Sequence, residues 1–92
     1  MNFWRTNNMN DYAEKLKKII AEELKCQVED ITDDAGWKKS NNWDSLAHIG
    51  IITAVENHFS IKIEDNQIEK LKDFSSILQY INKQKNNQYG IF

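Results

Sequence analysis

Asn42-Trp43-Asp44-Ser45-Leu46, with the apolar run that continues to Phe59, predicts the central helix of the fold. Asp44 is a strong N-cap residue, because its carboxylate accepts hydrogen bonds from the first free amides of a helix. Ser45 then takes the first helical position, with its hydroxyl at the positive end of the helix dipole. A serine presented in this way on a small helical protein suits the covalent attachment of a chemical group.

The remainder of this helix carries two apolar stripes. At 100° per residue, one arc that should face the core contains His48, Ile51, Ile52, Val55 and Phe59. A neighbouring stripe contains Leu46, Ile49 and Thr53, with Glu56 on its edge. This second stripe is either a partner-binding surface or a packing surface for another helix of the same domain, and the sequence favours neither.

Apolar spacing predicts three more helices. They cover Asp11 to about Gln27, Glu64 to Leu71 and Asp73 to about Lys83. In the short helix predicted over Glu64 to Leu71, the side chains of Ile68 and Leu71 should point into the core. The long connection from Val28 to Trp43 should be held to the body by Val28, Ile31 and Trp37.

The fold class that follows is all-α. We expect a four-helix bundle of three longer helices and one short helix, with a long loop between the first two. The helical domain should cover residues 11–83, with a loose tail at residues 1–10 and a second tail at residues 84–92.

Composition narrows the functional classes. A chain of 92 residues with a net charge of −2 is one domain without the basic surface that nucleic-acid binding requires. Cys26 is the only cysteine, which excludes an internal disulfide and favours a reducing compartment. The N-terminus does not resemble a secretory signal, and the apolar stretch from Ala47 to Val55 is interrupted by polar residues. We therefore expect a cytoplasmic monomer without a membrane segment.

Two catalytic interpretations are weak. Ser45 and His48 are suitably spaced for a nucleophile and a base, but no orienting carboxylate or glycine-rich oxyanion loop accompanies them. The core arc instead predicts that His48 is partly buried and hydrogen-bonded. Cys26, His48 and His58 lack the paired spacings of metal ligands, so no metal site is expected.

Three segments in order resemble the acyl carrier protein family, over about Asp11 to Lys83. Glu29 to Ala35 resembles the loop after the family's first helix, and Asp44-Ser45-Leu46 matches its attachment motif. Glu69-Lys70-Leu71, followed by Ile77 to Asn82, resembles its third and final helices.

The resemblance implies a non-enzymatic carrier. Ser45 would carry a 4′-phosphopantetheine arm, transferred from coenzyme A by a phosphopantetheinyl transferase. Acyl-activating and acyl-transfer enzymes would then load and unload acyl groups as thioesters. By analogy, these partners would dock on Asp44, Leu46, Ile49 and Glu56, with Ile68 either contributing or remaining in the core.

Departures from the family pattern point to a specialised carrier. Family members in fatty-acid synthesis usually have an acidic second helix, whereas Ala47, Gly50 and Asn57 stand here at positions that are often acidic. We therefore expect a stand-alone carrier for a specialised biosynthetic pathway. The alternatives are an aminoacyl or peptidyl carrier, which uses the same arm, and a helical protein-interaction module without a prosthetic group.

Overall fold

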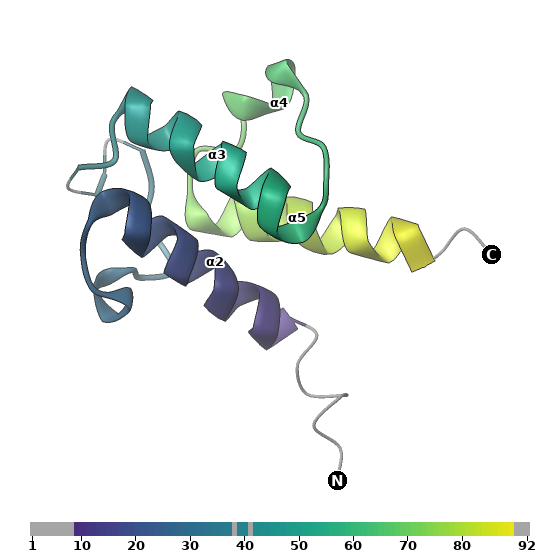
Figure 1. The fold of residues 1–92 in the computed structure, drawn as a ribbon, viewed down its shortest axis with the longest axis horizontal. Helices are drawn as coiled ribbons and strands as arrows, with labels where there is room; N and C mark the ends of the chain where they lie inside the picture. Colours follow the sequence, from purple (N-terminus) through teal and green to yellow (C-terminus); the bar gives the residue numbers. More distant parts are fainter. Residues whose placement is uncertain (1–8, 38, 41, 90–92) are drawn as a thin grey trace, which may run out of the picture.

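The computed structural model describes residues 9–37, 39–40 and 42–89, and within them the regular elements are helices (Figure 1). In chain order they are α2 (Met9–Leu24), the 3₁₀ helix η1 (Val28–Asp30), α3 (Ser45–Phe59), α4 (Asp65–Ile68) and α5 (Phe74–Tyr89). Four α-helices, one of them short, with a long loop before α3, confirm the predicted all-α bundle. No helix in the described part of the chain is long and apolar enough to cross a membrane.

The longer helices meet around one core. Helices α2 and α3 run side by side in opposite directions, and α5 packs against α2 (Figure 1). Burial of apolar side chains along these contacts supplies most of the driving force for folding. Among the described residues, the side chains with no exposed surface include Leu16, Ile20, Ile51, Val55, Ile77 and Ile81.

Helix α2 begins two residues before the predicted Asp11 and ends at Leu24 rather than near Gln27. It ends there because Lys25 adopts a left-handed backbone conformation, with φ of 58°. The amide of Cys26 then bonds back to the carbonyl of Ala21 at 3.0 Å, which closes the helix. Sequence spacing missed this end because Lys25 carries no glycine-like signal.

The long loop is fixed to the start of α5. The amide of Trp37 donates to the carbonyl of Lys72 at 2.8 Å, and the amide of Phe74 donates to that of Ala35 at 2.9 Å. Between them, a β-carbon on Gly36 would lie 2.9 Å from that of Asp73, so this close approach requires glycine.

The three predicted anchors of the loop are confirmed. Ile31 is buried, and Val28 and Trp37 pack against the core from partly buried positions. The core face of α3 is also confirmed, since His48, Ile51, Ile52, Val55 and Phe59 are all buried.

Helices α4 and α5 also differ from their predicted bounds. Helix α4 has only four residues, so Leu71 lies beyond its end, although it is buried as expected. Helix α5 continues to Tyr89, so the prediction that it ends near Lys83 was wrong. No proline or glycine stands between Lys83 and Tyr89, so this segment contains no strong helix breaker, although the apolar spacing has ended. Of the predicted tails, residues 1–8 and 90–92 lie outside the described residues.

Candidate functional site

Ser45 is the first residue of α3 and is exposed. Asp44 has an extended backbone, and its Oδ1 accepts a hydrogen bond from the amide of Ala47 at 2.9 Å. The predicted N-cap is therefore confirmed. Because Asp44 is itself held in place, the serine after it has a fixed position at the positive end of the helix dipole.

A chain of buried hydrogen bonds lies behind this serine. The indole Nε1–H of Trp43 donates to Nδ1 of His48 at 3.0 Å, and Nε2 of His48 lies 3.0 Å from the carbonyl oxygen of Ile68. These partners require the neutral imidazole with its proton on Nε2, so that this nitrogen donates to the carbonyl. Trp37 stacks on the same ring, with centroids 4.9 Å apart and planes 22° from parallel.

This geometry leaves His48 unsuited to act as a base for Ser45. The imidazole is 1% exposed, and both ring nitrogens already have partners within the protein. A general base must reach the proton that it removes, directly or through one water. The predicted hydrogen bonding of His48 is confirmed, and its burial is more complete than the partial burial that was predicted. Trp43, at 2% exposed, was not assigned to the core from the sequence, because a tryptophan after a polar loop belongs to no periodic pattern.

The second stripe of α3 lies on the surface. Leu46 is 82% exposed and Ile49 is 50% exposed, and among the described residues these are the large hydrophobic side chains that lie on the surface. Thr53 beside them is exposed as well. The alternative that this stripe packs on another helix within the domain is therefore excluded for Leu46.

Two other predicted docking residues already have structural contacts. The Oε2 of Glu56 accepts a hydrogen bond from the amide of Ile63 at 2.7 Å, which ties α3 to the segment after it. Ile68 is partly buried against the core, and its carbonyl faces His48.

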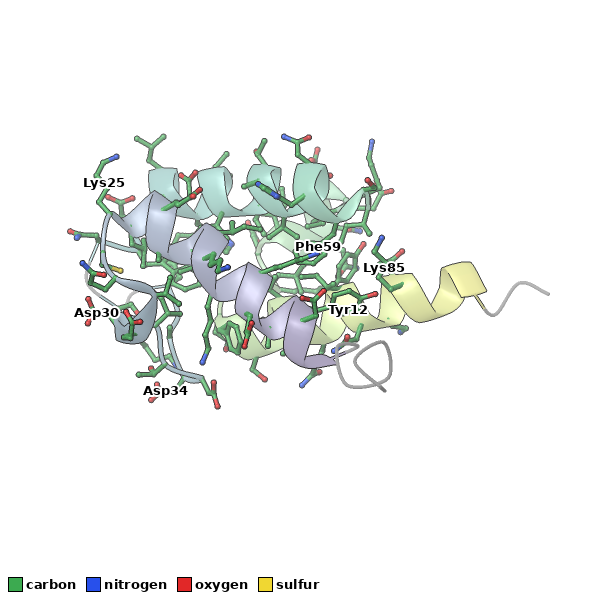
Figure 2. The ribbon with its side chains drawn as sticks, turned by 60° about the horizontal axis from the view of Figure 1, so that its bottom comes forward. Tyr12, Lys25, Asp30, Asp34, Phe59 and Lys85 are labelled. Atoms are coloured by element: carbon green, nitrogen blue, oxygen red, sulfur yellow. The ribbon has the colours of Figure 1, made fainter. Side chains whose placement is uncertain are left out.

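A hollow of about 420 Å³ adjoins the start of α3. Its walls come from the end of α2, the residue before Trp43 and the first turn of α3: Glu23, Leu24, Lys25, Asn42, Asp44, Leu46 and Ala47. In Figure 2, Lys25 is labelled at the loop end of the bundle, near the start of α3. An exposed hydroxyl, a helix N-terminus and adjacent open space fit a group attached at Ser45 through a phosphodiester.

The side chain of Glu23 reaches from α2 to α3 at Gly50, where α3 has no side chain. A β-carbon built on Gly50 would lie 2.9 Å from the carboxyl carbon of Glu23 and even closer to its Oε1. The exposed carboxylate of Glu23 therefore occupies the surface position that a residue at Gly50 would otherwise fill. The position of Glu23 over Gly50 could not be predicted from the sequence, because the contact joins two helices far apart in the chain.

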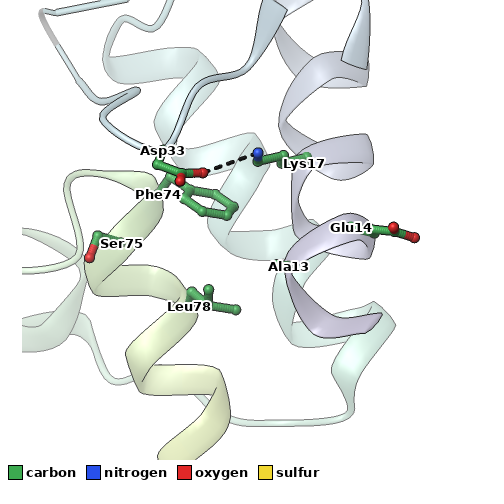
Figure 3. A pocket seen from close by; sticks show the side chains of 7 residues that line it. All are labelled: Ala13, Glu14, Lys17, Asp33, Phe74, Ser75 and Leu78. Carbon is green, nitrogen blue, oxygen red and sulfur yellow. Dashed lines mark ion pairs between the residues drawn. The ribbon is translucent and has the colours of Figure 1, made fainter. Parts of the chain in front are cut away.

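Other polar features do not form a second site. A hollow of about 500 Å³ lies between α2 and α5. At this hollow, Lys17 pairs with Asp33 at 3.1 Å and lies near the ring of Phe74, as the side chains in Figure 3 show. This hollow receives no residue from α3. Among the described residues, no group of three or more His, Cys, Asp or Glu side chains is arranged to hold a metal ion. Desolvation, with the nearby charge of Asp30, raises the pKa of the exposed Cys26 thiol, which disfavours its nucleophilic thiolate.

The chain is similar to known proteins over most of its length. Residues 14–81 match the family model described as "Phosphopantetheine attachment site". The chain is 35% identical over 75 residues to an acyl carrier protein of Thermosynechococcus vestitus, which covers 82% of this chain and 93% of the relative. It is 38% identical over 74 residues to an acyl carrier protein of Buchnera aphidicola, covering 80% and 94% respectively.

Proposed function

Because this chain belongs to the acyl carrier protein family, whose prosthetic group is a covalently bound 4′-phosphopantetheine, we propose that it carries acyl groups on an arm attached to Ser45. The arm supplies a terminal thiol on which acyl groups travel as thioesters. The observation that carries the proposal is the exposed Ser45 hydroxyl at the first position of α3, fixed by the cap that Asp44 makes.

The chain's own part in attachment is to present a nucleophile. In the transfer, the Ser45 oxygen forms a bond to the phosphorus that carries pantetheine in coenzyme A. The phosphoanhydride bond breaks, adenosine 3′,5′-bisphosphate leaves, and the hydroxyl proton passes to a base of the transferase. Free amides and the dipole at the start of α3 favour the negative charge that remains on Ser45. Lys25, on the wall of the adjacent hollow, adds a positive charge nearby.

A carrier role, which needs no catalytic base beside Ser45, also fits the position of His48. His48, the nearest candidate base in the sequence, is buried and fully hydrogen-bonded. The protein's contribution is then to hold the cargo at high effective concentration near the active site of each partner enzyme.

We place the docking surface on Leu46 and Ile49, flanked by Asp44. Neighbouring exposed apolar side chains are typical of protein-binding surfaces, and these two lie three residues apart on the same face of α3. The side chain of Glu23 lies over Gly50 and places a carboxylate on the surface of α3, whose own sequence has few acidic residues. Glu56 and Ile68 belong to the margin of this surface, since each already makes contacts within the fold.

The partners of this surface would be a phosphopantetheinyl transferase and enzymes that activate and transfer acyl groups. The scarcity of acids on α3 supports a specialised pathway rather than general fatty-acid synthesis. A monomer in a reducing compartment such as the cytoplasm fits the single, exposed cysteine.

Intact-mass measurement after incubation with coenzyme A and a broad-specificity transferase tests the attachment. The protein should gain the mass of one phosphopantetheine, and Ser45→Ala should gain none. A gain that survives Ser45→Ala would place the arm elsewhere, and no gain at all would favour the interaction module. Offering acyl-activating and aminoacyl-activating enzymes to the loaded protein then separates an acyl carrier from an aminoacyl or peptidyl carrier.

A further inference from the structure

The interior next to Ser45 is bridged from α3 to α4. His48 lies one turn along α3 from Ser45, and its ring spans from the indole of Trp43 to the carbonyl of Ile68, the last residue of α4. Each bond is 3.0 Å long, and the imidazole is 1% exposed. The space between the start of α3 and the end of α4 is therefore occupied by a histidine that is bonded to both sides.

Two tryptophans fill the space around the His48 ring. Trp43 is 2% exposed and lies beside His48, and Trp37 covers the imidazole face by stacking. An apolar acyl chain attached near Ser45 would gain free energy by leaving water for a protein interior. To enter here, it would have to displace aromatic rings and leave the buried Trp43 indole N–H, both ring nitrogens of His48 and the Ile68 carbonyl without partners. Unpaired buried polar groups oppose that entry.

The open space beside Ser45 has a different character. Glu23, Lys25, Asn42 and Asp44 contribute charged and amide groups to the hollow on the α2 side. Leu24, Leu46 and Ala47 add apolar surface to its walls, but the hollow is open to solvent and does not enclose a long alkyl chain. Its charged and amide groups can hydrogen-bond a polar acyl group.

We infer that the bundle is closed to its cargo by the Trp43–His48–Ile68 chain, and that the protein carries short or polar acyl groups that stay in solvent. This inference rests on the proposed attachment at Ser45 and adds the substrate class. It makes Trp43 and His48 specificity-determining residues that act by occupying the interior.

A chain-length series on the full protein tests the inference. Acetyl-, hexanoyl- and dodecanoyl-phosphopantetheine are loaded from the matching coenzyme A thioesters, and intact mass confirms loading on Ser45. Two quantities are then measured for each form: the rate of thioester cleavage by hydroxylamine, and the position of the Trp43 indole signal in ¹H–¹⁵N spectra. We expect cleavage rates within about twofold of one another and an unmoved indole signal. A chain sheltered roughly nine-tenths of the time would instead be cleaved about tenfold more slowly.

The outcomes separate the two proposals. Failure to load would overturn attachment, and the cargo inference with it. Loading followed by slower cleavage or a moving indole signal as the chain lengthens would overturn only the closed interior. In His48→Ala, which removes the bridge, the dodecanoyl form should become protected relative to the acetyl form. If that variant does not fold, the wild-type series still decides the matter.

Discussion

Replacing Trp43 with phenylalanine should destabilise the bundle through the loss of a single hydrogen bond and some packing. The phenyl ring keeps an aromatic side chain in a position that is 2% exposed, but it cannot donate to Nδ1 of His48. Leaving a buried acceptor unpaired costs about 1–3 kcal/mol. For a domain of this size, each kcal/mol lowers the melting temperature by about 4–8 °C.

A double-mutant cycle isolates the bond from the packing. His48→Leu alone leaves the Trp43 indole N–H and the Ile68 carbonyl without their partner. The Trp43→Phe, His48→Leu double variant removes the donor and the Nδ1 acceptor together, so it should cost less than the sum of the single variants. We expect a coupling free energy of about 1–2 kcal/mol from urea unfolding curves. Single-variant effects that add to within about 0.5 kcal/mol would refute the bond's role.

Three further predictions concern the docking surface, the end of α3 and the start of α5. Leu46→Ala should lower the transferase kcat/KM for this protein by about fivefold to tenfold, because it removes an exposed apolar anchor. The control variant His58→Ala changes an exposed residue at the far end of α3 and should leave kcat/KM unchanged. Equal effects of the two variants would show that docking does not depend on Leu46. Glu56→Ala should lower the free energy of unfolding by about 1–2 kcal/mol, because the amide of Ile63 loses a charged acceptor, and an unchanged urea midpoint would contradict this. The pKa of Asp73 is held below its usual value mainly by a hydrogen bond from the backbone amide of Ser76, and also by one from the Ser76 side chain. The stability that the ionised carboxylate contributes is therefore present above about pH 4 and is lost as the pH falls. In Asp73→Asn that loss should be absent. The melting temperature of the variant should therefore fall less steeply than that of the wild type as the pH is lowered from about 5 to about 2.

The features that the sequence predicted well are those with a local cause. The capping role of Asp44 depends on a side chain and an amide three residues apart, and the core face of α3 depends on helical periodicity. Both are contained within one helix. Ser45 could therefore be placed at the first helical position before any tertiary contact was known.

The features that were missed depend on contacts between distant segments. Glu23 reaches Gly50 from another helix, and the closeness of Gly36 to Asp73 is equally non-local. The Trp43–His48 pair did leave a signal, because a tryptophan two residues before Ser45 and a histidine three residues after it flank the same cap. The predicted docking role of Glu56 did not anticipate its bond to Ile63, since nothing in the sequence shows how the chain turns after α3.

The most direct test of the account is peptide mass spectrometry of the protein purified from the cells that produce it. Trypsin should release the segment from Ser40 to Lys62, which contains Ser40, Ser45 and Ser60. Fragmentation of this peptide can assign a modification to one of the three serines. We expect phosphopantetheine on Ser45. An unmodified Ser45, in cells whose other carrier proteins bear the arm, would contradict it.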